Sequence, residues 1–207
     1  LGERPGPWPT IVAAAGATST LRFGTLTINN DVWNPVVLAR DAATADVFTD
    51  GRVELGLGAG WKTDDYQWTG IPRDPIGTRI ARLAESVAII KACFGGTTFE
   101  HRGKHFNVSG VEGWPPPVQR PLPIFIGGSG PRILSLAARE ADIVGIHVNL
   151  NAQTFGGATA TAVEVRVVVG LHAAVERAWR HAVRLLWLEL LLHPDLHRSA
   201  SSVSTTP

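Results

Sequence analysis

The chain has 207 residues, enough to bury one sizeable hydrophobic core, and 44% of them are hydrophobic. Its 19 basic and 18 acidic side chains leave a formal net charge of +1, which argues against a nucleic-acid-binding protein and against electrostatic attachment to a membrane. The single cysteine, Cys93, excludes an internal disulfide, and no segment reaches the roughly 20 apolar residues of a membrane helix, so we expect a cytoplasmic protein.

The first half of the chain alternates helix-like and strand-like segments. An alanine-rich stretch at 9–19 is typical of the end of a helix, and residues 21–28 (LRFGTLTI) predict a buried strand. Asn34 and Pro35 predict the next helix, because asparagine caps helix N-termini and proline suits the first helical position. Its buried side is expected to carry Val36, Val37, Ala39, Ala43 and Val47. Residues 52–58 (RVELGLG) predict the second strand.

The middle of the chain continues this alternation after one interruption. Residues 77–94 predict a long helix with one apolar stripe, which the Gly95-Gly96 pair ends. Residues 97–121 predict an excursion from the main fold: a small hairpin followed by a proline-rich run. A strand, a helix and a strand are then expected at 123–127, 131–140 and 142–148.

This order of mostly apolar strands and helices predicts parallel βα units, in either an open doubly wound sheet or a closed barrel. After about residue 150 the composition changes, because four of the seven histidines and none of the lysines lie there. We therefore expect a main domain over 1–160. Residues 161–207 are expected to form a divergent tail, helical at 173–192 and disordered at its end.

The turn from Gly127 to Arg132 is a candidate anion site. A strand ends at glycines, which let backbone approach a ligand closely, and a helix begins at Pro131. The free amides and positive dipole end of that helix suit a phosphate, to which Ser129 adds a hydroxyl and Arg132 a charge. A tight turn without a ligand remains the alternative, since one glycine-rich turn is weakly specific.

The glycines at 56, 58 and 60 do not match a dinucleotide-binding fingerprint, because the third spacing differs and no apolar helix follows. Two interpretations remain open for them. A strand end kept small suits a flat ring lying against it, and glycine also allows close strand packing. Asp64 and Asp65, which follow, are more typical of a helix cap and a solvated charge than of proton donors.

Other polar and aromatic residues favour structural roles. His101 and His105 lack Cys or His partners at ligand spacing, so no metal site is predicted. Arg79, Arg82 and Glu85 are expected to pair on the exposed side of the long helix. Four tryptophans are candidates to cap a pocket, although packing is the commoner role: Trp33, Trp61, Trp68 and Trp114.

Three segments in order carry a resemblance to a known family. They are LRFGTLTINNDVWNPVVLARDAATADVFTDGRVELGLGAGW, RIARLAESVAIIK and PPPVQRPLPIFIGGSGPRILSLAAREADIVGI. Over about residues 1–150 they resemble luciferase-like monooxygenases, and within these the branch that uses the deazaflavin coenzyme F-420. The resemblance implies an α/β fold of the (β/α)8 TIM-barrel type. It also implies an incomplete barrel, because relatives carry two βα units before the position of Leu1.

The resemblance also implies where the cofactor binds. In relatives a non-proline cis peptide, here matched by Leu26-Thr27, forms a bulge behind the cofactor ring. The loop 58–61 matches the ring-side loop after the next strand, and 127–130 matches the phosphate loop. The implied cofactor-binding residues are Leu26, Thr27, Gly58, Ala59, Gly60, Gly127, Gly128, Ser129, Gly130 and Arg132.

The implied activity is hydride transfer to, or oxygenation of, a small organic substrate. The cofactor is expected to be F-420, with flavin mononucleotide (FMN) as the alternative, and a homodimer is compatible. Some relatives carry an acidic glutamate where Trp61 stands, so no catalytic residue is assigned. The competing hypotheses are a non-catalytic flavin or deazaflavin binder and an inactive barrel fragment, which would expose unpaired sheet edges.

Overall fold

The computed structural model describes residues 5–147 and 164–168. They belong to one compact unit that extends from Leu1 to Val168. Most of the predicted tail, including the helix at 173–192, lies outside the described residues.

The helices and strands follow the predicted order, apart from three added elements and one predicted strand that is divided in two. The helices are α1 (Pro7–Gly16), α2 (Pro35–Phe48), α3 (Thr63–Thr69), α4 (Ile76–Phe94) and α5 (Pro131–Glu140), with a 3-10 turn, η1, at Asn30–Val32. The strands are β1 (Phe23–Gly24), β2 (Ile28–Asn29), β3 (Val53–Gly58), β4 (Phe99–Arg102), β5 (Asn107–Val111), β6 (Ile124–Gly128), β7 (Ile143–His147) and β8 (Glu164–Val168).

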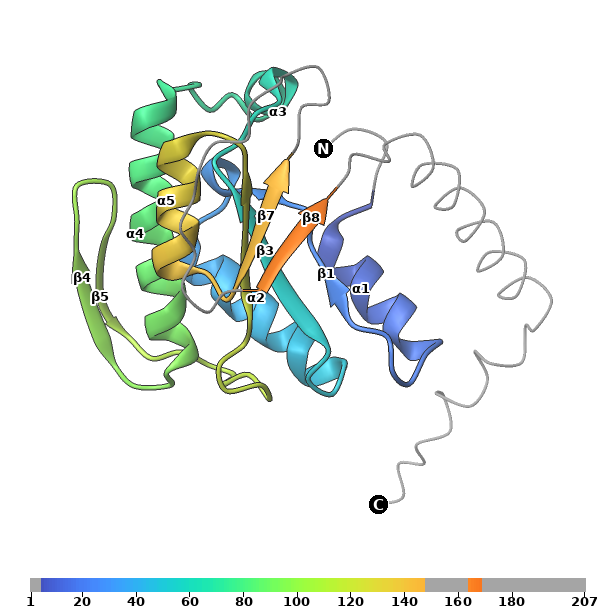
Figure 1. Ribbon diagram of the computed structural model, residues 1–207. Coiled ribbons are helices and arrows are strands. Elements are labelled where there is room, and N and C mark those ends of the chain that lie inside the picture. Colours follow the sequence, from blue (N-terminus) through green and yellow to red (C-terminus); the bar gives the residue numbers. More distant parts are fainter. Residues whose placement is uncertain (1–4, 148–163, 169–207) are drawn as a thin grey trace, which may run out of the picture. The chain divides into compact units, whose positions relative to one another are not determined.

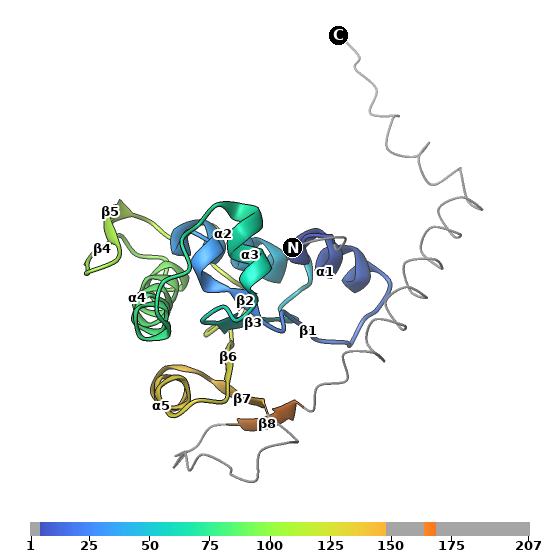
Figure 2. The same cartoon turned by 90° about the horizontal axis from the view of Figure 1, so that it is seen from above.

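Six strands form one parallel sheet in the order β1-β3-β6-β7-β8, with β2 also paired to β3. Figures 1 and 2 show the strands following an arc, with α1, α2, α4 and α5 on its outer side. A doubly wound sheet would carry helices on both faces. Helices on one face of a curved parallel sheet instead indicate part of a (β/α) barrel, which decides between the two architectures left open by the sequence.

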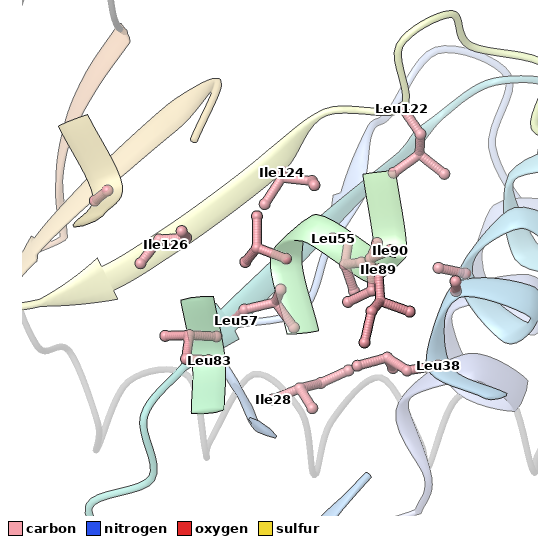
Figure 3. Packing of buried hydrophobic residues seen from close by; sticks show 14 of the residues in the cluster. Ile28, Leu38, Leu55, Leu57, Leu83, Ile89, Ile90, Leu122, Ile124 and Ile126 are labelled. Carbon is pink, nitrogen blue, oxygen red and sulfur yellow. The ribbon is translucent and has the colours of Figure 1, made fainter. Parts of the chain in front are cut away.

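The core lies between the sheet and these outer helices. Val53, Leu55 and Leu57 of β3 are fully buried, as are Ile124 and Ile126 of β6. Figure 3 shows these strand side chains packed with α4 and α2 through Leu83, Ile89, Ile90 and Leu38. Burial of this many large aliphatic side chains is the main stabilising contribution to the unit.

Helix α2 begins where the sequence predicts. The side chain of Asn34 accepts hydrogen bonds from the amides of Val36 and Val37, and Pro35 occupies the first helical position. Its predicted buried side is partly wrong, because Val37 is 39% and Val47 41% exposed. Alanines pack more closely on the sheet, and the buried residues of α2 are Pro35, Leu38, Ala39, Ala42, Ala43, Ala45 and Asp46.

Three local predictions need correction. The strand expected at 21–28 is divided into β1 and β2 by a bulge at 25–27. A short helix, α3, follows the loop after β3, although its polar sequence does not resemble an amphipathic helix. Residues 164–168 of the predicted tail form strand β8, parallel to β7, since EVRVV carries three β-branched residues.

The predicted excursion is a two-stranded antiparallel hairpin, β4-β5, that is not part of the main sheet. Glu85 of α4 fastens its turn, accepting hydrogen bonds from the amides of Lys104, His105 and Phe106 at 2.9–3.0 Å. Burial opposes ionisation of Glu85, but these amide bonds outweigh it and lower its pKa below the ordinary value. In the described part of the chain, no helix is long and apolar enough to cross a bilayer.

Candidate cofactor site

Three neighbouring strands carry the predicted site residues, which lie in the bulge before β2 and at or just after the carboxyl ends of β3 and β6. Strand β3 is the middle one: Asn29 of β2 pairs with Gly58, and on the other side Leu57 pairs with Ile126 of β6. The loops that follow β2, β3 and β6 therefore emerge at the same edge of the sheet. Ligands of parallel α/β folds bind at this edge, because helix N-termini and flexible loops meet there.

The bulge between β1 and β2 is held by a threonine side chain. The hydroxyl of Thr25 donates to the carbonyl oxygen of Gly56 at 2.9 Å and accepts from the amide of Gly56 at 2.8 Å. A Cβ atom on Gly56 would lie 1.7 Å from the carbonyl oxygen of Thr25, so only glycine fits under the bulge. The peptide bond between Leu26 and Thr27 is cis, as the family resemblance implies.

The bulge also lies close to β6, the strand beyond β3. A Cβ atom on Gly58 would lie 2.6 Å from Oγ1 of Thr27, and one on Gly127 would lie 3.0 Å from Cγ2 of the same threonine. Thr27 therefore lies over both β3 and β6, while Leu26 at the tip of the bulge is 68% exposed. Of the two interpretations of the β3 glycines, close packing accounts for Gly56 and Gly58, because the bulge fills the space beside them.

The loop after β3 is buried at its start and exposed at its end. Ala59 is 6% exposed, whereas Trp61 is 76% exposed. Gly60 has a φ of +71°, and a Cβ atom there would lie 2.2 Å from Oη of Tyr66 and 2.3 Å from Oδ1 of Asn29. Glycine is therefore required by both conformation and space.

A buried polar network surrounds this loop. The guanidinium of Arg79 donates to the carbonyl oxygens of Ala59, at 2.9 Å, and of Gly60. The hydroxyl of Tyr66 donates to Oδ2 of Asp31 at 3.1 Å. Burial raises the pKa of Tyr66; the bond from Arg79 opposes this, and the charge of Asp31 adds to it.

Asp31 extends the network to a second arginine. Its side chain is fully buried, and Oδ1 lies 2.9 Å from Nη1 of Arg82, which also pairs with Asp74. The prediction that Arg79 and Arg82 lie on the exposed side of α4 is therefore wrong, since Arg79 is 5% exposed and the Arg82 side chain 19% exposed. The helix turns these arginines toward the loops at the sheet edge, where carbonyl and carboxylate oxygens neutralise them.

The glycine-rich turn after β6 is open. Ser129 and Arg132 are exposed, and Gly130, at the N-cap position of α5, provides no side-chain cap. Pro131 has no amide hydrogen, so the amides of Arg132 and Ile133 are the first donors of the helix, and no side chain caps them. Unpaired helical amides beside an exposed hydroxyl fit an anion such as a phosphate.

Two of the predicted phosphate-loop residues have further constraints. A Cβ atom on Gly128 would lie 2.4 Å from Cγ2 of Ile133, so this glycine lets the strand approach the helix. The guanidinium of Arg132 approaches the first turn of α4, where Nη1 lies 3.2 Å from the Cβ position of Gly77. Arg132 therefore lies beside the turn, between α5 and α4.

The predicted tryptophan cap is not assembled as one group. Trp33 lines a hollow of about 440 Å³ with Arg82 and Phe106, and Trp114 lines a separate hollow beside α2. Neither hollow is lined by residues of the bulge or of the turn after β6. Trp68 stacks under the ammonium of Lys62, 4.7 Å from its ring centre, and is 54% exposed.

The histidines of the excursion belong to the hairpin. His101 places Nε2 3.5 Å from Oε2 of Glu85. A Cβ atom on Gly103 would lie 2.1 Å from that same carboxylate oxygen. Among the described residues, no group of three or more His, Cys, Asp or Glu side chains is placed to hold a metal ion.

The sequence did not predict the Asp31, Tyr66 and Arg79 network. A local signal for it exists: the polar run Asn29–Asp31 directly follows a buried strand, and Tyr66 is the only tyrosine. A strand end is where parallel folds gather functional polar groups. The partner arginine, Arg79, comes from α4, which begins ten residues after Tyr66. The apolar stripe of that helix does not distinguish a buried arginine from an exposed one.

Comparison with known proteins identifies the family of this chain. The profile of the luciferase-like monooxygenase family matches residues 2–193. The chain belongs to this family. The match extends past about residue 150, where the resemblance seen in the sequence ends.

One dehydrogenase is similar to the chain in sequence, and two enzymes of known structure are similar to it in fold. The F-420-dependent hydroxymycolic acid dehydrogenase of Mycobacterium tuberculosis is 31% identical over 145 residues, which are 68% of this chain and 39% of that protein. The coenzyme F-420 dependent tetrahydromethanopterin reductase of Methanopyrus kandleri has a similar fold, with a TM-score of 0.63 and 22% identity over 70% of this chain and 45% of that one.

The second protein of similar fold is the oxygenating constituent of 3,6-diketocamphane monooxygenase from Pseudomonas putida, solved in complex with FMN. Its TM-score is 0.57 at 20% identity, covering 70% of this chain and 44% of that one. The chain spans about half the length of the curated relatives it matches, 48% for the first of them. These structures confirm an α/β fold with a parallel half-barrel sheet.

Proposed function

We propose that this chain binds the deazaflavin coenzyme F-420 for an oxidoreductase reaction on a small organic substrate, with FMN as the alternative cofactor. One observation carries the proposal: Thr27 of the bulge lies against Gly127, directly before the open turn at Ser129. A surface for a flat ring and a site for its anionic tail are therefore neighbours. A relative that is 31% identical and named F-420-dependent favours the deazaflavin.

The residues of this chain would hold and orient the cofactor. The amides of Arg132 and Ile133 and the hydroxyl of Ser129 would bind a phosphate of the tail. The exposed side chain of Leu26 and the buried backbone of Ala59 would face the ring. When bound, the deazaflavin supplies hydride transfer at its central ring.

The protein's contribution is then to position the reactants and to exclude water. The Thr25 hydroxyl fixes the bulge through two hydrogen bonds to one glycine, so the ring-side surface exists before a ligand arrives. Preformed surfaces lower the entropic cost of binding and bring reacting atoms into register. Exposed apolar groups such as Leu26 and Trp61 would become covered when a ring and substrate lie on them.

Titration of the purified protein with F-420 and with FMN, followed by fluorescence, tests this function. We expect saturable binding of F-420, tighter than that of FMN. The variant Ser129→Asp should weaken it by about tenfold or more, because a carboxylate repels the phosphate. Ser135→Asp adds the same charge to an exposed position farther along α5 and is the matched control.

Each outcome of this titration separates one hypothesis from the others. Tighter binding of FMN than of F-420 would identify FMN as the cofactor in place of the deazaflavin. Saturable binding without reduction of the cofactor by any donor would indicate a non-catalytic binder. Absence of binding by a cooperatively folded protein would overturn the proposed function.

A further inference from the structure

We propose that Arg79 is a positioning residue that sets the ring-facing backbone at Ala59 and Gly60. The inference rests on the proposed function and deepens it, because it assigns a role at the cofactor ring to a helix residue outside the expected binding loops. Arg79 lies in the first turn of α4, twenty positions beyond Ala59 in the chain. Its hydrogen bonds to the predicted site residues Ala59 and Gly60 go to their backbone oxygens.

The first argument is the chemistry of the loop. Beyond Gly58, β3 no longer pairs with its neighbours, so the carbonyl oxygens of Ala59 and Gly60 need other donors. One nitrogen of Arg79, Nη1, donates to both. The Nε–H of the same side chain donates to the carbonyl oxygen of Asp74 at 2.9 Å, which anchors the guanidinium plane.

The second argument is burial. Arg79 is 5% exposed, and a guanidinium is normally kept in water unless its donors are satisfied. Because water does not compete at this position, the bonds to the carbonyl oxygens hold more strongly than surface bonds would. An arginine is suited to this task, since its planar fork presents several donors in a fixed geometry that lysine lacks.

The third argument is the space beside Gly60. Oη of Tyr66 and Oδ1 of Asn29 occupy it, so no Cβ atom fits there. Nη1 of Arg79 also lies 3.5 Å from Oη of Tyr66, so the guanidinium and these oxygens together confine the backbone at 59–60. Its position, and with it the distance to any ring lying on Ala59, is decided by Arg79 before a ligand binds.

Two measurements on Arg79→Met test the inference. The first needs no ligand: amide hydrogen exchange within 58–62 should accelerate by about tenfold, while exchange in 127–132 stays unchanged. The second is affinity for the deazaflavin riboside, which lacks the phosphate. In Arg79→Met the affinity for the riboside should fall about tenfold, and the affinity for F-420 should fall by the same factor. The affinity for inorganic pyrophosphate should not change.

Matched variants keep the test sharp. Arg73→Met is the control, because the exposed Arg73 donates to the neighbouring carbonyl of Trp61 at 3.4 Å and should change neither measurement. Arg79→Lys retains the charge and should restore part of the riboside affinity. If Arg79→Met does not fold, Arg79→Lys is compared with wild type in both measurements, and a loss confined to 58–62 and the riboside supports the inference.

The inference is overturned if folded Arg79→Met binds the riboside as wild type does, or if riboside and pyrophosphate affinity fall together. The proposed function fails in a different way, through a wild-type protein that binds neither F-420 nor FMN. In that case hydrogen exchange in 58–62 still decides whether Arg79 holds the loop.

Discussion

The two halves of the candidate site are built in opposite ways. On the β2–β3 side, the loop at Ala59 is confined by buried polar groups from two helices, and the bulge is bonded to Gly56 through Thr25. On the β6–α5 side, the turn at Ser129 is exposed, and the helix after it begins without a side-chain cap. The protein's own hydrogen bonds hold the β2–β3 half in place, and we call it the braced side. The β6–α5 half, the open side, leaves the first amides of α5 without a side-chain partner.

This difference indicates which part of a ligand each half meets. A ring used for hydride transfer must be held within a fraction of an ångström, so a rigid surface suits it. An anionic tail needs only donors and positive charge, which an open helix N-terminus provides. Substitutions on the braced side should therefore change stability, and those on the open side should change affinity alone.

The largest expected effect is that of Gly56→Val. Its Cβ atom would overlap the backbone of Thr25, so the bulge and β3 cannot keep their positions. We expect a loss of about 3 kcal/mol or more in the free energy of unfolding, measured by urea denaturation. Gly16→Ala, at a helical position with no atom near its Cβ, should leave that free energy unchanged or slightly raised. Equal stability of the two variants would contradict the packing described for the bulge.

The next largest effect is expected for Asp31→Ala. It leaves Arg82 without its buried carboxylate and Tyr66 with only its longer hydrogen bond, to Oδ1 of Asn29 at 3.4 Å. Because Arg82 keeps its pair with Asp74, we expect a loss of about 2 kcal/mol rather than that of a wholly unpaired buried charge. Asp64→Ala removes an exposed carboxylate 3.6 Å from Lys62 and should cost less than about 0.5 kcal/mol by the same denaturation.

A smaller effect is expected at low pH in the β4-β5 hairpin, which belongs to neither half of the site. The folded-state pKa of Glu85 lies below its ordinary value of 4.5, so its stabilisation of the hairpin is complete above that value. It should be lost as the pH falls through the lowered pKa. The protection factors of the amides at residues 104–106 should then fall by an amount equivalent to about 1 kcal/mol. Glu85→Gln should show low protection factors at every pH; a pH-dependent protection factor in that variant would assign the effect to another group.

The smallest effect on stability is expected for Ser129→Ala and Arg132→Met. Both side chains are exposed, so the free energy of unfolding should change by less than about 0.5 kcal/mol in each variant. Affinity for F-420 should nevertheless fall about fivefold, since each removes one contact to the tail. A stability loss matching that of Asp31→Ala would show that the turn is as tightly built as the braced side.

Much of this fold could be predicted from local sequence patterns. The Asn34-Pro35 start of α2, the Gly95 end of α4 and the order of the parallel strands all follow from short-range chemistry. The bulge was placed by family resemblance, since nothing in the composition of LRFGTLTI distinguishes an interrupted strand from a continuous one. Periodicity alone also left barrel and doubly wound sheet undecided, because both repeat the same βα unit.

The braced side could not be predicted because its contacts join distant segments. Arg79 meets Ala59 across 20 residues, and Tyr66 meets Asp31 across 35. Helical spacing places Arg79 on a face, but whether that face meets solvent depends on loops folded elsewhere. The open turn, by contrast, is formed by consecutive residues from Gly127 to Arg132, so local sequence was sufficient to describe it.

Hydrogen exchange with and without F-420 tests most directly whether the braced and open halves form one site. The account predicts simultaneous protection of three segments on binding: 25–28, 58–61 and 127–132. Protection confined to one half, or located only outside these segments, would contradict it.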